Sequence, residues 1–147
     1  MNTVKDLLVT KGSTVFTIAP EATVLEALAL MADKDIGALV VMSGGKLAGI
    51  LSERDYARKI ALKGKFTKET RVRDIMSPAV RTVTSGQSVE ECMKIMTESH
   101  YRHLPVLENG TLLGLISIGD IVKNIIMDQK FMIQNLESYI TGAPEVR

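Results

Sequence analysis

The chain has 147 residues, of which 46% are hydrophobic and 24% are charged, and its formal net charge is +1. This length supports one compact domain or two small halves with a shared core, and the near-neutral charge argues against nucleic acid as a partner. No apolar run is long enough to span a bilayer, the N-terminus lacks a signal-peptide pattern, and the lone Cys92 cannot form an internal disulfide. We therefore expect a cytoplasmic protein with no membrane partner.

The first half of the chain predicts a strand–helix–strand–strand–helix order. In chain order, we expect a strand over 15–18, a helix over 24–34, strands over 38–42 and 47–51, and a helix from 53 onward. The first helix begins with a predicted capping box, because the Thr23 hydroxyl is followed three residues later by Glu26. The glycine-bearing turn at 43–46 predicts a hairpin.

The second half repeats this order after a polar segment over 63–71, which we interpret as a linker. The expected elements are a strand over 80–83, a helix over 89–99 with a capping box at its start, strands over 104–107 and 112–116, and a helix from 118 onward. The tail over 128–139 has apolar residues at helical spacing and predicts a further helix that packs back onto the domain.

The two halves align with one another at an offset of 65 residues, without a gap, from Val15 and Val80 as far as Lys59 and Asn124. The matched positions include Gly49 with Gly114, Ser52 with Ser117, and Asp55 with Asp120. We therefore divide the chain into repeat 1 with an N-terminal segment (1–62), a linker (63–71), repeat 2 (72–127) and a C-terminal helix with its tail (128–147).

The repeated motif at the end of the last strand, GILSERD at 49–55 and GLISIGD at 114–120, fits two roles. A Ser followed three residues later by Asp at a helix start is the pattern of an N-cap and its reach-back partner. The same arrangement suits a nucleotide, because a helix N-terminus offers N–H groups to phosphate and a carboxylate accepts hydrogen bonds from a ribose diol. The residues alone leave both roles open.

The sequence resembles a tandem pair of CBS domains, a Bateman module, over residues 4–127. The motifs that carry the resemblance are DIMSP (74–78), YRHLPVLENG (101–110), GILSERD and GLISIGD. SERDYARK (52–59) and NLESYITG (135–142) are similar to stand-alone CBS-pair proteins of bacteria and plant organelles. The resemblance implies an α/β (α+β) fold of two βαββα repeats packed with pseudo-two-fold symmetry, and modules that pair as homodimers.

The resemblance also implies two clefts that hold an adenosyl ligand such as AMP, ATP or NAD, with S-adenosylmethionine ranked behind them. Carried over position by position, the first cleft consists of Ile50, Ser52, Arg54, Asp55, Val80, Arg81, Tyr101, Arg102 and His103. The second cleft consists of Thr14, Val15, Phe16, Ile36, Gly37, Ala38, Leu115, Ser117 and Asp120.

The two predicted clefts differ in charge. The first collects Arg54, Arg81, Arg102 and His103, whereas the matching positions of the second are Gly119, Phe16, Gly37 and Ala38. We therefore expect the first cleft to prefer ligands with more phosphate, and the second to accept adenosine or AMP with little dependence on salt. The alternative is that Arg102 and His103 are merely solvated residues before a strand.

Other candidate sites are weak. Two histidines and one cysteine make a poor metal-ligand set, Cys92 falls on an apolar helix face as a core residue, and the lysines of the linker are interpreted as solvated. We expect no catalysis and no metal. The predicted function is a regulatory adenosyl-nucleotide sensor that signals to a partner protein; the alternative is a structural homodimeric module with empty clefts.

The first helix also predicts how the dimer forms. Its second face carries Leu25, Ala29 and Ala32, whereas the matching face of the second helix carries Glu90, Lys94 and Thr97. A helix that is apolar on both faces is normally buried on both. We therefore expect the helix over 23–33 to meet its own mate across a two-fold axis, unless the tail helix covers it.

Overall fold

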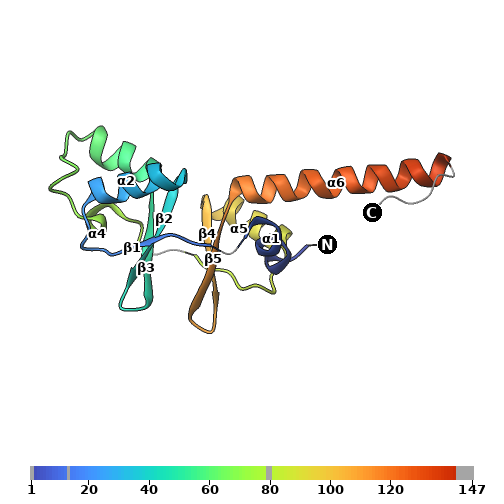
Figure 1. The fold of residues 1–147 in the computed structure, drawn as a ribbon, viewed down its shortest axis with the longest axis horizontal. Coiled ribbons are helices and arrows are strands. Elements are labelled where there is room, and N and C mark those ends of the chain that lie inside the picture. The colour runs from blue at the N-terminus through green and yellow to red at the C-terminus, as the bar shows by residue number, and fades with distance from the viewer. Residues whose placement is uncertain (1, 13, 79–80, 142–147) are drawn as a thin grey trace.

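The computed structural model describes residues 2–12, 14–78 and 81–141. Two hairpins stand side by side at the centre, with helices above and beside them and one long helix projecting away (Figure 1). The elements are α1 (Val4–Lys11), β1 (Thr17–Ile18), α2 (Val24–Lys34), β2 (Ala38–Ser43), β3 (Lys46–Ser52), α3 (Glu53–Tyr56), the π-helix η1 (Ala57–Ala61), α4 (Val72–Ile75), α5 (Val89–Ser99), β4 (His103–Glu108), β5 (Thr111–Ser117) and α6 (Ile118–Thr141).

The strands form two sheets, and both predicted hairpins are confirmed. The first sheet has the order β1-β2-β3, with β1 parallel to β2, and the second is the β4-β5 hairpin. Each hairpin turns through two residues with positive φ, Gly44 and Gly45 in one and Asn109 and Gly110 in the other. Two-residue loops of this kind match the twist of the flanking strands, which explains the glycine-bearing turns in the sequence.

The two predicted helices over 24–34 and 89–99 are confirmed, but their capping boxes form only in part. The Thr23 hydroxyl accepts from the Glu26 amide at 3.1 Å, and the Ser88 hydroxyl accepts from the Glu91 amide at 3.0 Å. The reciprocal glutamate bonds do not form. At the second helix the Glu91 carboxylate accepts from the Gln87 side chain at 3.2 Å instead.

The predicted short strands are shorter than expected. The strand over 15–18 is reduced to β1, which covers Thr17 and Ile18. Of the strand over 80–83, Val80 lies outside the described residues, and Val83 forms only an isolated parallel bridge to Val106. The Val83 amide donates to Pro105 and the Val83 carbonyl accepts from Leu107, so a single residue docks against β4.

Each repeat completes its core with a helix that precedes the other repeat in the sequence. α1 contributes Val4, Leu7 and Leu8 to the core of repeat 2, and α4 contributes Val72 and Ile75 to the core of repeat 1. The backbone bridges are equivalent: Thr3 pairs with Ser88, and Arg71 pairs with Thr23. The two repeats are therefore interlocked through their leading helices.

The predicted tail helix is not separate, and the prediction that it packs back onto the domain is wrong. α6 runs without interruption from Ile118 to Thr141 and projects away from the sheets (Figure 1). The sequence explains this, because no Gly or Pro occurs between residues 120 and 141 to break the helix. Its outer residues stay exposed, with Leu136 at 59% and Tyr139 at 88%. No described helix is long and apolar enough to cross a membrane.

Candidate functional site

The two repeated Ser–Asp motifs form complete capping boxes. The Ser52 amide donates to the Asp55 carboxylate at 2.9 Å, and the Asp55 amide donates to the Ser52 hydroxyl at 3.2 Å. The matching distances at Ser117 and Asp120 are 2.8 and 3.2 Å. The cap interpretation is therefore confirmed, and each pair also lines a cleft, because both roles use the same helix start.

The repeated glycines serve packing within the chain. A Cβ on Gly49 would lie 2.6 Å from the Ser77 carbonyl oxygen, and a Cβ on Gly114 would lie 2.8 Å from a methyl group of Leu8. Ser77 follows α4 and pairs with the backbone of Ile50. Each glycine therefore makes room for the segment that leads into the opposite repeat.

The first cleft has a volume of about 570 Å³ and lies between α3, α5 and the start of β4. It brings together most of the residues predicted for it: Ile50, Ser52, Arg54, Asp55, Tyr101, Arg102 and His103. Of the two others, Val80 lies outside the described residues and Arg81 is exposed and does not line the cleft. Residues that the sequence prediction missed complete the wall: Gly37, Arg58, Ser77, Met96, Thr97, His100 and Ile118.

Three arginines line the first cleft: Arg54, Arg58 and Arg102. The charge of Arg58, then loss of hydration and the charge of Arg102, hold the pKa of Arg54 below its ordinary value. Like charges crowded in this way are relieved by an anion. Arg54 lies in α3 and Arg58 follows it by four residues in the π-helix η1, and this spacing was the signal that could have found Arg58.

The second cleft has a volume of about 350 Å³ and lies between the segment before β1, the start of β2 and the end of β5. All nine residues predicted for it are among those that line it: Thr14, Val15, Phe16, Ile36, Gly37, Ala38, Leu115, Ser117 and Asp120. Three more side chains join them: Lys11, Asp35 and His103.

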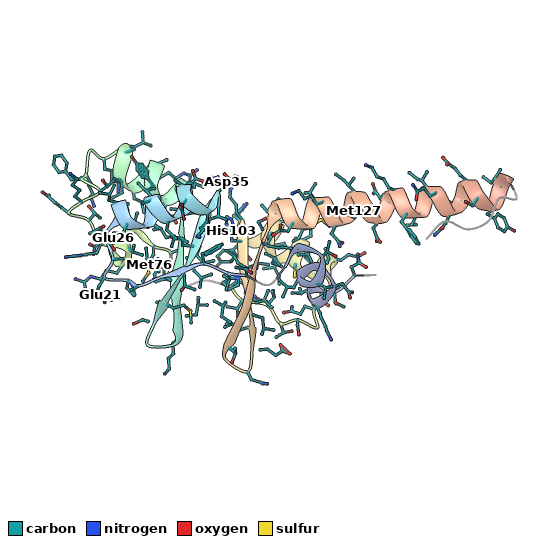
Figure 2. All side chains as sticks on the ribbon, viewed as in Figure 1. Glu21, Glu26, Asp35, Met76, His103 and Met127 are labelled. Atoms are coloured by element: carbon teal, nitrogen blue, oxygen red, sulfur yellow. The ribbon has the colours of Figure 1, made fainter. Side chains whose placement is uncertain are left out.

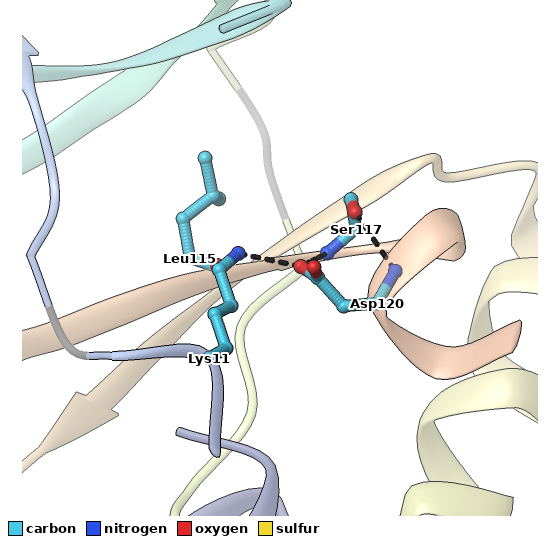
Figure 3. A network of polar contacts seen from close by, with 4 residues as sticks. All are labelled: Lys11, Leu115, Ser117 and Asp120. Atoms are coloured by element: carbon cyan, nitrogen blue, oxygen red, sulfur yellow. Dashed lines mark hydrogen bonds and ion pairs between the residues drawn. The ribbon is translucent and has the colours of Figure 1, made fainter. Parts of the chain in front are cut away.

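The expectation that the second cleft lacks a cation is wrong, because Lys11 reaches into it (Figure 3). The Lys11 ammonium lies 2.5 Å from Asp120 Oδ2 and also donates to the Leu115 carbonyl. Lys11 reaches the cleft because α1 is longer than its counterpart α4. α1 has eight residues and α4 has four, so α1 extends one turn further and ends at Lys11. The sequence alignment could not show this, since the N-terminal segment lies outside the gap-free register.

Asp120 is held ionised. Burial pushes the pKa of this carboxyl upward, but hydrogen bonds from Lys11 and from the Ser117 amide outweigh it, so the pKa lies below its ordinary value. The two side chains are 31% and 19% exposed, so water screens the pair only in part.

His103 lines both clefts and lies between the two repeats (Figure 2). Burial, then the charge of Lys11, lowers the pKa of His103 below its ordinary value, and Asp120 and Asp55 oppose this. The imidazole is therefore neutral near pH 7, with one nitrogen that can donate a hydrogen bond and one that can accept.

Cys92 is fully buried in the core of repeat 2, as predicted. Burial raises the pKa of its thiol to about 11, so the thiolate that a nucleophile requires is scarce near neutral pH. Within the described ranges, no group of three or more His, Cys, Asp or Glu side chains is arranged to hold a metal ion.

Two interlocked repeats that enclose two polar clefts, each with a Ser–Asp helix start, define a tandem-repeat module for binding small molecules. The family model of the CBS domain matches residues 4–62 and 72–127, so the chain belongs to the CBS-domain family. The resemblance drawn from the motifs is confirmed, and so is the α/β fold of two repeats.

Proteins of similar sequence or structure include CBS-domain proteins of a plant and of bacteria. The mitochondrial CBS domain-containing protein CBSX3 of Arabidopsis thaliana is 36% identical, over 95% of this chain and 72% of its own. The solved structure of a CBS-domain protein of Burkholderia ambifaria MC40-6 is 50% identical, covers 87% of this chain and 96% of its own, and has a TM-score of 0.83. The CBS domain pair of protein MJ0100, 22% identical over 87% and 98% with a TM-score of 0.77, was solved with 5′-methylthioadenosine and S-adenosylmethionine.

Proposed function

We propose that this protein is a non-catalytic sensor of an adenosyl nucleotide, and that ligand binding alters its signal to a partner protein. The observation that carries the proposal is the first cleft, where Arg54, Arg58 and Arg102 line the same space as Ser52 and Asp55. Guanidinium groups suit phosphate oxygens, and a carboxylate beside them suits the hydroxyls of a ribose.

The ligand class follows from this pairing of charges. Three arginines favour ATP or NAD over an uncharged nucleoside, and the cleft volume of about 570 Å³ is within the range of small-molecule sites. The adenosyl compounds bound by the MJ0100 pair support an adenosine moiety as the common part. A cation such as S-adenosylmethionine fits the arginine cluster less well than a polyphosphate does.

The second candidate function is a homodimeric interaction module. It is favoured by the outer face of α2, where Leu25 is 42% exposed and Ala29 and Ala32 are also exposed. α6 leads away from α2 and does not cover this face (Figure 1). We propose that a second copy of the chain covers this face. The regulated protein binds elsewhere on the dimer, and both act in the cytoplasm.

A ligand screen by thermal unfolding tests the sensor proposal. A compound that binds only the folded state raises the melting temperature, so AMP, ATP, NAD, NADH and S-adenosylmethionine are compared at equal concentration. We expect the largest rise with a phosphate-bearing adenosine compound. If none of them raises the melting temperature, the interaction module becomes the better account.

The variant Asp55→Ala tests whether the ligand binds in the first cleft. Loss of hydrogen bonds to a charged acceptor is worth roughly 1.5–3 kcal/mol, which weakens binding about tenfold to a hundredfold by calorimetric titration. The matched control is Asp6→Ala, because Asp6 completes a capping box with Thr3 but lines neither cleft. Equal affinity in the folded Asp55→Ala protein and in wild type would remove Asp55 from the site.

A further inference from the structure

The side chain of Lys11 occupies part of the second cleft. Its carboxylate Asp120 corresponds to Asp55 of the first cleft, but Asp120 is paired with a lysine from another part of the chain, 109 residues away in sequence. The ammonium of Lys11 lies 2.5 Å from Asp120 Oδ2 and also donates to the Leu115 carbonyl on β5 (Figure 3). One oxygen of the carboxylate that would accept from a ribose is thus already paired with a cation.

In the first cleft, the part of the chain that the structure describes places no cation from a distant segment on Asp55. The lysine near its carboxylate, Lys59, lies 3.5 Å from Asp55 Oδ1 and donates to the Ile75 carbonyl at 2.9 Å. Lys59 sits one helical turn along the same helical segment and does not line the cleft. The carbonyl that matches Leu115 is that of Ile50, and it accepts from the Ser77 backbone amide. The backbone of the Ser77 segment therefore fills in repeat 1 the place that the Lys11 side chain fills in repeat 2.

We propose that Lys11 sets the ligand selectivity of the second cleft by acting as a displaceable internal cation. A ribose diol that binds both oxygens of Asp120 must replace the Lys11 ammonium at Oδ2. An uncharged nucleoside leaves the displaced ammonium without a partner, whereas a 5′-phosphate accepts it within the same cleft. The second cleft is therefore selective for anionic nucleotides over nucleosides. This inference rests on the proposed function, because it requires an adenosyl ligand.

The other charges of the cleft reinforce this dependence. Asp35 lines the same wall, and His103 is held neutral there by burial. Among the described residues that line the second cleft, Lys11 is the one lysine or arginine. Without it, a phosphate that enters this cleft meets the carboxylates of Asp35 and Asp120 with no compensating cation.

The test compares adenosine with AMP at the second cleft alone. The amide NMR signal of Gly119 reports this cleft, and that of Arg54, at the matching position, reports the first. In wild type we expect AMP to bind the second cleft more tightly than adenosine. In Lys11→Met we expect adenosine to bind more tightly than in wild type, and the preference for AMP to fall by roughly tenfold, the value of one charge-assisted contact.

Two controls decide what a negative result means. Lys5→Met removes a lysine from the same helix that lines no cleft and should leave the preference unchanged, while Lys11→Arg should retain most of it. If AMP binds near Gly119 with the same preference in Lys11→Met as in wild type, the inference is overturned and the sensor function stands. If neither compound perturbs Gly119 in wild type, the inference is overturned, and if ATP and NAD also leave Arg54 unperturbed, the proposed function itself fails.

Discussion

Arg54, Arg58 and Arg102 are three cations that face one cleft, and the ion pairs found among the described residues include none of them. Replacing Arg54 and Arg102 together by Gln should weaken ATP binding by at least about tenfold more than adenosine binding, because only ATP uses the guanidinium groups. Calorimetric titration at low and high salt measures both losses. The salt dependence of ATP binding should shrink in the double variant. Equal losses for ATP and adenosine would contradict the phosphate assignment.

His103 predicts a pH dependence of stability. Its pKa is lowered in the folded state relative to 6.5, so between the two values the unfolded chain binds more protons. Its contribution to stability is therefore complete above pH 6.5 and is lost as the pH falls through 6.5 toward the folded value. Chemical denaturation at pH 7 and pH 5 should show a smaller loss in His103→Gln than in wild type.

Acidic groups do not interfere with that comparison. Asp6 and Asp120 have folded pKa values below 3.8, so the stability they contribute is lost only as the pH falls below 3.8. The charged groups that act on His103 are Lys11, Asp120, Arg102 and Asp55. A variant and a wild type with identical losses would show that His103 does not titrate in this range.

At the scale of elements, Gly49 and Gly114 occupy equivalent positions, but we expect substitution by Ala to lower the free energy of unfolding by different amounts. Gly49→Ala places a Cβ against the Ser77 carbonyl, which is fixed by two backbone hydrogen bonds to Ile50. Gly114→Ala meets a methyl group of Leu8, which can rotate. We expect Gly49→Ala to lower the free energy of unfolding by about 1–3 kcal/mol and Gly114→Ala by less. Equilibrium denaturation measures both, and a larger loss at Gly114 would contradict this order.

The elements show what the sequence can and cannot predict. Helices 24–34 and 89–99 and both hairpin turns were predictable, because caps, apolar period and turn glycines act locally. The exchange of α1 and α4 between repeats was not, since it depends on packing between distant segments. The same exchange brings Lys11 to Asp120, so the sequence prediction of the second cleft did not include Lys11.

In the whole molecule, the exposed face of α2 predicts a homodimer. Leu25→Glu with Ala29→Glu sets like charges against each other across an isologous contact and should yield monomers. Sedimentation at micromolar concentration should show a dimer for wild type and a monomer for the double variant. The charge-matched control is Lys94→Glu on the equivalent face of α5, which should remain dimeric. A monomeric wild type, or a dimeric double variant, excludes this interface.

Because α1 and α4 each pack into the core of the other repeat, the two cores are completed at different times during synthesis. The core of repeat 1 is complete once Ile75 has been made, whereas that of repeat 2 combines Val4 with residues as late as Ile121. At typical translation rates, residues 76–121 take roughly 2–9 s. Through that interval the apolar face of α1 has no core to enter, although α1 is made before both repeats. A segment made before both repeats is thus among the last to be buried, and for those seconds its apolar face stays open to a chaperone.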